Sequence, residues 1–159
     1  MYRNTEGSIK CTLLTEQALI IGINYIGTPV QLKGCINDAR NMSMFINRQY
    51  RFPFGDMVIL TDDNPDPRSK PTKDNIIRAM KWLVEDARPH DSLFFHYSGH
   101  GGQSVDLRWD HVSGYDDTIY PVDFRRTGQI NSEVRRNYTC LTFRKCMQSW
   151  YDLYLWDAV

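Results

Sequence analysis

A histidine- and glycine-rich stretch, Asp91–Gly102, holds the residue types in this sequence that best fit catalysis. It reads DSLFFHYSGHGG, an apolar and aromatic run typical of a buried strand followed by glycines typical of a tight loop. His100 lies where the strand gives way to the loop. A general base must reach its substrate, titrate near the working pH and sit on a rigid element. His100 is therefore either a general base or a loop histidine that bonds a backbone carbonyl.

The other histidines are weaker candidates for chemistry. His96 shares a strand face with Phe94 and Ser98, because side chains alternate along a strand, and we expect it to be a hydrogen-bonded core residue. His90 and His111 lie in loop contexts, and we expect them to be in solvent.

A cysteine is the natural partner for His100, since Cys–His pairs make nucleophiles without a metal. Cys35 lies at an expected helix N-terminus, where the dipole favours thiolate, although a small buried hydrophobe is the alternative role. Cys140 and Cys146 have Thr-Cys-Leu and Lys-Cys-Met flanks, without the glycine-containing turn that would present a thiolate. The fourth cysteine is Cys11. No two of the four form a CxxC pair, which argues against a zinc site. No nucleophile is identified.

Acidic residues gather after the glycine loop, and hard cations such as calcium require several carboxylate oxygens. Without an EF-hand spacing, a solvated acidic loop is the alternative. The residues concerned are Asp106, Asp110, Asp116, Asp117 and Asp123. Asp38, just inside an expected helix, either favours the helix dipole or receives a cationic group in a nearby crevice.

The elements that position these residues alternate between strands and helices. Apolar runs predict strands at 18–23, 57–60 and 92–98, and helical spacing predicts helices at 35–50 and from Thr72 to Ala87. Two successive βαβ units imply a parallel sheet covered on both faces. The crevice at the strands' carboxyl ends should join His100 to Asn24 and to residues 34–38. Further on, the pattern predicts a loop at 103–115, a short strand at 117–122 and a helix face between Met147 and Leu155.

Composition narrows the class of protein. A length of 159 residues fits one domain, and zero net charge argues against a nucleic-acid partner. The longest apolar run, 18–23, is too short to span a membrane, and the start has no signal-peptide pattern. We expect a reducing, cytoplasmic location, with the nucleus also accessible. Residues 1–124 carry 13 Lys+Arg and 16 Asp+Glu, whereas residues 125–159 carry 6 and 3, so the tail differs in character.

Six segments together resemble the fungal metacaspases, a branch of the caspase-like cysteine endopeptidases. They occur in family order over about residues 18–130. The segments are ALIIGINYIGT (18–28), LKGCINDA (32–39), LTDD (60–63), RAMKWLV (78–84), DSLFFHYSGHGGQ (91–103) and DDTIYPVDF (116–124).

The resemblance implies a caspase-like three-layer α/β/α sandwich with a mostly parallel sheet. It also implies cleavage of polypeptides after arginine or lysine, calcium stimulation and a link to programmed cell death. By motif position, His100 resembles the catalytic base and Gly101 the donor of an oxyanion-hole N–H. Asp38 and Ser98 match positions of the basic-residue pocket, and Asp116 matches a calcium-binding aspartate.

Two departures from the family pattern shape the expected function. Asn131 and Ser132 replace a pair of family aspartates, and the Asp-Ser-Cys-His-Ser-Gly motif that holds the nucleophile does not occur. We therefore expect a lead-in at 1–17, an incomplete catalytic domain at 18–130, and a divergent tail at 131–159 that arises from truncation or an altered reading frame. Such a chain should be inactive alone. The alternative is a non-catalytic protein that associates with itself or a relative through an exposed sheet edge.

Overall fold

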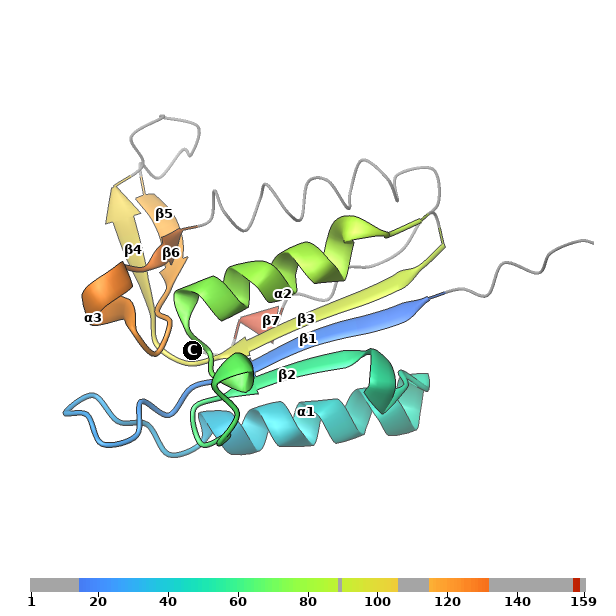
Figure 1. Cartoon of the computed structure of the whole chain (residues 1–159), viewed down its shortest axis with the longest axis horizontal. Helices are drawn as coiled ribbons and strands as arrows, with labels where there is room; N and C mark the ends of the chain where they lie inside the picture. The colour runs from blue at the N-terminus through green and yellow to red at the C-terminus, as the bar shows by residue number, and fades with distance from the viewer. Residues whose placement is uncertain (1–14, 89, 106–114, 132–155, 158–159) are drawn as a thin grey trace, which may run out of the picture.

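The chain folds around a parallel β-sheet with one helix on each face (Figure 1). The computed structural model describes residues 15–88, 90–105, 115–131 and 156–157. The sheet has the order β2-β1-β3-β7, and each pairing in it is parallel. Its strands are β1 (Glu16–Gly22), β2 (Met57–Thr61), β3 (Ser92–Ser98) and β7 (Trp156–Asp157). The helix α1 (Cys35–Tyr50) connects β1 to β2, and α2 (Lys73–Glu85) connects β2 to β3.

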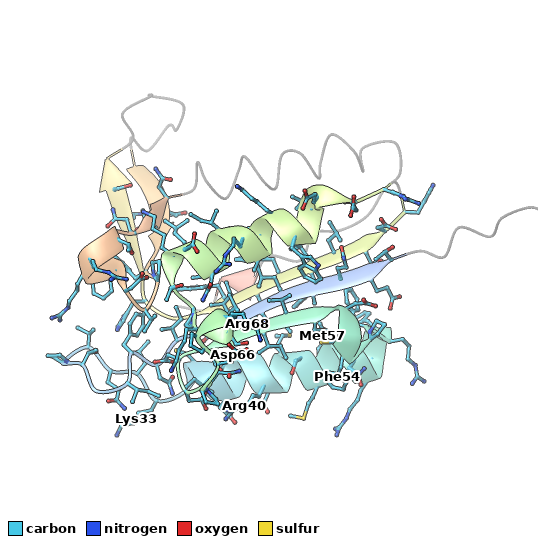
Figure 2. All side chains as sticks on the ribbon, in the orientation of Figure 1. Lys33, Arg40, Phe54, Met57, Asp66 and Arg68 are labelled. Carbon is cyan, nitrogen blue, oxygen red and sulfur yellow. The ribbon has the colours of Figure 1, made fainter. Side chains whose placement is uncertain are left out.

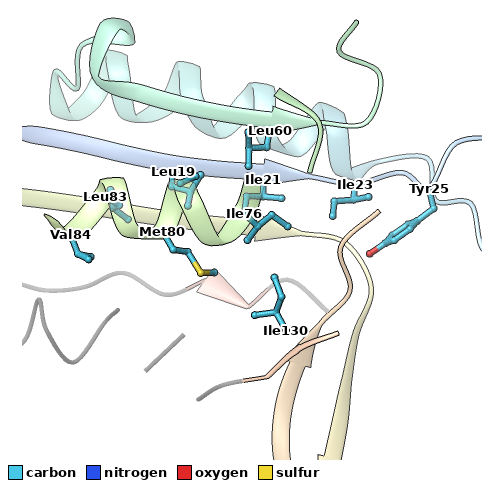
Figure 3. Packing of buried hydrophobic residues seen from close by; sticks show 11 residues of the cluster. Leu19, Ile21, Ile23, Tyr25, Leu60, Ile76, Met80, Leu83, Val84 and Ile130 are labelled. Atoms are coloured by element: carbon cyan, nitrogen blue, oxygen red, sulfur yellow. The ribbon is translucent and has the colours of Figure 1, made fainter. Parts of the chain in front are cut away.

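The central strand β1 is buried on both faces, which explains its continuous apolar run. Leu19 and Ile21 pack with residues of α2, whereas Ala18 and Ile20 pack with residues of α1, and all four have no exposed surface. Figure 3 shows Met80 and Leu83 of α2 over the first of these faces. A strand covered on both faces is typical of parallel sheets. The predicted three-layer α/β/α architecture is therefore confirmed.

Local contacts explain where the two main helices begin. Thr72 caps α2, because its side-chain oxygen accepts the Asn75 backbone N–H at 3.3 Å. At the start of α1, the Asn24 side chain accepts the Ile36 N–H at 3.4 Å. A Cβ on Gly22 would meet the Cys35 carbonyl and the Ala39 side chain, so glycine there lets α1 lie directly on the end of β1.

A second, antiparallel sheet follows His100 and stands beside the carboxyl end of β3 (Figure 1). Its order is β4-β5-β6, with β4 (Gly101–Val105), β5 (Tyr115–Ile119), β6 (Ile130–Asn131) and the short helix α3 (Phe124–Thr127) before β6. The predicted loop at 103–115 was wrong for residues 103–105 and for Tyr115. The sequence GGQSV has no apolar alternation, and its strand is made by backbone pairing with β5. The predicted strand at 117–122 lies instead at 115–119.

The outer edge of β3 carries β7, in register His96 with Trp156 and Tyr97 with Asp157. The sequence predicted an unpaired edge here, and this was wrong at those two positions. The expected helix face at 147–155, and Cys11, Asp106, Asp110, His111, Cys140 and Cys146, lie outside the described residues. In the described part, no helix has the length and apolarity needed to cross a bilayer.

Candidate active site

The site lies where the carboxyl ends of β1 and β3 meet. Beyond the last paired residues, the Ile23 N–H donates to the Ser98 carbonyl at 2.9 Å, so the two strands stay together to their ends. The segment 24–34 then leaves β1, and His100 leaves β3 two residues after Ser98. This placement brings His100, Asn24 and the start of α1 to the same end of the sheet, as the sequence predicts.

The imidazole of His100 is oriented by a backbone carbonyl. Its Nε2 lies 2.8 Å from the Val30 carbonyl oxygen. A carbonyl can only accept, so Nε2 carries the hydrogen, and in the neutral ring Nδ1 is left as a proton acceptor. The ring also lies 4.8 Å from that of Tyr25, centroid to centroid. The sequence offered two roles for His100, a general base or a loop histidine that bonds a backbone carbonyl. The carbonyl contact is present, and it leaves Nδ1 for base chemistry.

The segment that carries Val30 is anchored by Asp62. This carboxylate is only 7% exposed and accepts the Asn24 N–H at 2.8 Å and the Ile26 N–H at 3.0 Å. Its own carbonyl accepts from Lys70 Nζ at 2.7 Å. Asp62 therefore links the end of β2 to the segment that orients His100.

The predicted pocket residues Asp38 and Ser98 are in contact. The buried Ser98 hydroxyl donates to Asp38 Oδ2 at 3.2 Å, while the Asp38 side chain remains exposed on the first turn of α1. A carboxylate in this position can receive a cationic group from solvent. Cys35, one turn earlier, is a buried free thiol, which fits the role of a small hydrophobe.

His96 lies on β3, on the same face as Ser98 and two residues before it, and is 4% exposed. We expected it to be hydrogen-bonded, and this was wrong, because neither ring nitrogen has a partner among the described residues. Burial lowers the pKa of His96, and the charge of Asp38 acts in the opposite direction. His96 is therefore a neutral core imidazole beneath the pocket. His90 is exposed, as expected.

Gly101 begins β4 directly after His100 and pairs with Ile119. The Tyr120 N–H donates to the His100 carbonyl at 3.2 Å, which makes His100 and Tyr120 a hydrogen-bonded pair. Because such pairs alternate in an antiparallel ladder, the Gly101 N–H points away from β5. Gly101 is also exposed.

Asp116 is the predicted site residue that the structure does not bring to this crevice. Its backbone lies in β5, opposite Ser104, and its side chain is outside the described part. Within the described ranges, no group of three His, Cys, Asp or Glu side chains converges as a metal site would require. No calcium ligand set is therefore assigned.

Sequence reasoning missed four contributors to the site, which are Tyr25, Val30, Asp62 and Tyr97. Val30 acts through its carbonyl, so no side-chain pattern marks it. Tyr25 has a left-handed backbone, with φ at 53°, and non-glycine residues with positive φ often mark functional sites. Tyr25 and Tyr97 have apolar neighbours that favour a core role, and their hydroxyl contacts appear only in three dimensions.

The fold has a counterpart among solved structures. Protein GSU0716 from Geobacter sulfurreducens superposes with a TM-score of 0.58 over 78% of this chain and 44% of that chain, at 24% identity. The open, mostly parallel sheet between helices agrees with a caspase-like α/β fold, and His100 lies at the carboxyl end of β3, where open α/β sheets bind their ligands.

The chain belongs to the metacaspases. The family model "Metacaspase, peptidase C14 domain" matches residues 16–145. The chain is 63% identical over 136 residues to Metacaspase-1 of Coccidioides immitis and 62% identical over 118 residues to Metacaspase-1B of Neurospora crassa. These matches cover 85% and 74% of this chain but 28% of each relative. Metacaspase-1A of Aspergillus fumigatus is 61% identical over 122 residues, which cover 76% of this chain and 30% of that protein.

Proposed function

We propose that this chain is the histidine-bearing part of a cysteine endopeptidase domain that accepts polypeptides with arginine or lysine before the scissile bond. The observation that carries the proposal is the orientation of His100 by Val30. With the hydrogen on Nε2, the free Nδ1 can accept the proton of an attacking thiol and return it to the departing amine.

The neighbouring groups suit the other requirements of peptide cleavage. Asp38 and Ser98 offer oxygen atoms to a guanidinium or ammonium group, and the Gly101 N–H suits an oxyanion. The pocket is tested by calorimetric titration with a short amidated arginine peptide. Asp38→Asn should weaken binding about fivefold, as expected for an exposed ion pair of about 1 kcal/mol. Asp74→Asn, which changes another exposed aspartate in the first turn of a helix, is the matched control and should bind as the parent chain does. Equal affinity of all three proteins would refute the pocket.

We propose that the chain does not hydrolyse peptides by itself, because the family's nucleophile motif is absent from its 159 residues. The purified chain should not turn over an arginine-terminated fluorogenic peptide, with or without calcium. Turnover that Cys146→Ala abolishes would overturn the proposed inactivity and identify a relocated nucleophile.

Calcium binding is proposed from the family pattern at Asp116. A rise in the unfolding temperature with calcium, lost in Asp116→Asn and kept in Asp117→Asn, would support it. No shift in the parent chain would contradict it.

The alternative function is a non-catalytic, partner-binding protein. Its support is the β3 edge, where Ser92–Phe95 have no strand partner on the β7 side among the described residues. An unpaired edge is a template for another chain. Light scattering discriminates the two proposals, since a monodisperse monomer that binds the arginine peptide favours the peptidase role.

We propose a cytoplasmic location with access to the nucleus, and no nucleic-acid partner. The free, buried thiol of Cys35 and the zero net charge support these proposals. Imaging of a fluorescently tagged chain tests the location.

A further inference from the structure

The hydroxyls of Tyr25, which is buried, and Tyr97, which is partly buried, bond the backbone at His100, and these two residues are called the tyrosine clasp. The His100 N–H donates to Tyr25 Oη at 3.0 Å, and Tyr25 Oη donates to the Tyr120 carbonyl at 2.6 Å. Tyr97 Oη donates to the His100 carbonyl at 2.8 Å and accepts the Tyr120 N–H at 3.3 Å. All four backbone polar groups of the His100–Tyr120 pair are therefore bonded by a phenol.

Tyr25 Oη takes the place of a direct ladder bond. An antiparallel hydrogen-bonded pair normally exchanges two N–H···O bonds. Here the Tyr120 N–H reaches the His100 carbonyl at 3.2 Å, but the His100 N–H reaches the Tyr120 carbonyl only through Tyr25 Oη. The hydroxyl is thus inserted where the β4–β5 hairpin begins, and it ties that hairpin to the segment after β1.

The contact of Tyr97 bears on the neighbouring peptide bond. The His100 carbonyl and the Gly101 N–H belong to one planar peptide unit, and no described peptide bond is cis. In a trans peptide the C=O and N–H bonds point in opposite directions. The Tyr97 hydroxyl fixes the His100 carbonyl and therefore also fixes the direction of the Gly101 N–H. Hydrogen bonds to a carbonyl also polarise the peptide and strengthen its N–H as a donor.

Both phenols are suited to a permanent role as neutral donors. Tyr25 is 1% exposed, and burial raises its pKa. Burial, with the neighbouring Tyr25 as the next cause, raises the pKa of Tyr97 further. The two oxygens lie 3.1 Å apart. A Cβ on Gly99 would collide with the Tyr97 hydroxyl, so glycine there leaves room for the clasp.

We propose that Tyr25 and Tyr97 are positioning residues that hold the His100–Gly101 peptide so that its N–H faces a developing oxyanion. The inference rests on the proposed function, because it takes Gly101 as the oxyanion donor. It assigns the two hydroxyls a role in aiming and polarising that donor, beyond their packing in the core.

The test is NMR spectroscopy of the isotope-labelled chain and two single variants. In Tyr97→Phe, the His100 carbonyl loses a donor, so its ¹³C signal and the Gly101 amide proton should both move upfield. In Tyr25→Phe, the His100 amide loses its acceptor and should exchange about fivefold faster, the factor expected for one net hydrogen bond. In Tyr97→Phe the chemical shifts of the His100 ring nitrogens should remain those of the Nε2–H tautomer. A general loosening of the core would instead release His100 from Val30 and change these shifts.

Tyr120→Phe is the matched control, because it removes a hydroxyl from an adjacent ring and keeps the backbone groups of the clasp. Its His100 and Gly101 signals should stay at their parent positions. Unchanged signals in Tyr97→Phe would overturn the proposal. If Tyr97→Phe does not fold, the test uses the parent chain. A slowly exchanging Tyr97 hydroxyl proton with an NOE to the Tyr120 amide would support the proposal, and the absence of this signal would refute it.

These outcomes are independent of the proposed function. Failure of the chain to bind arginine peptides would refute the peptidase role and leave the NMR result unaffected. Unmoved signals in Tyr97→Phe, together with intact peptide binding, would refute the positioning role alone.

Discussion

Replacing Asp62 by alanine should both destabilise the fold and release His100. The carboxylate accepts two backbone N–H groups, from Asn24 and Ile26, in a site that is 7% exposed. A hydrogen bond to a charged group contributes about 1.5 to 3 kcal/mol, so losing both should cost about 3 kcal/mol or more. For a chain of this size, about 3 kcal/mol lowers the unfolding temperature by about 6 to 12 °C.

The same variant should alter the histidine, since the released segment carries Val30. NMR of the imidazole nitrogens should show a mixture of tautomers in place of a single Nε2–H form. Asp63→Ala is the control. Asp63 pairs with Arg40, an exposed residue labelled on α1 in Figure 2, and losing this pair should cost at most about 1 kcal/mol. If Asp62→Ala melts within about 2 °C of the parent chain and keeps the single tautomer, the anchoring role is refuted.

Three further predictions concern stability. The pKa of His96 in the folded chain is lowered from 6.5, so below pH 6.5 the unfolded chain binds more protons than the folded one and the free energy of unfolding should fall. His96→Leu should remove this part of the fall, as measured by urea titrations at several pH values. Leu19→Ala empties a fully buried position and should cost about 2 to 5 kcal/mol by chemical denaturation, and a smaller loss would contradict the described packing. Thr72→Ala removes the α2 cap and should cost about 1 kcal/mol, whereas Thr72→Ser should match the parent chain.

Much of the fold is predictable because its driving force is local in the sequence. The apolar runs at 18–23 and 92–98 favour strands, and the spacing of Ile76, Met80 and Leu83 favours a helix with one buried face. The boundaries of α1 agree at both ends. The strand GGQSV was missed because its stability comes from pairing with β5, and nothing in its own composition signals a partner.

The site is predictable only in part, for a related reason. Asp38 and Ser98 are marked by side-chain type and motif position, and their contact follows from the packing of α1 against β1 and β3. The tautomer of His100 depends on Val30, a residue 70 positions earlier that acts through its backbone. The partner-less state of His96 was also unforeseeable, because strand alternation predicts burial and does not predict bonding.

The long reach of the Tyr25 hydroxyl has a consequence for how the protein folds. Tyr25 and Tyr120 are 95 residues apart, and Tyr25 and His100 are 75 apart. Contacts between distant residues form late, because the entropy of closing long loops must first be overcome. The alignment of the His100 backbone is therefore completed late in folding. A chain that has emerged only as far as Gly102 would carry His100 and Tyr25 without the Tyr120 groups that they bond, so the backbone at His100 is not fixed until residue 120 has docked.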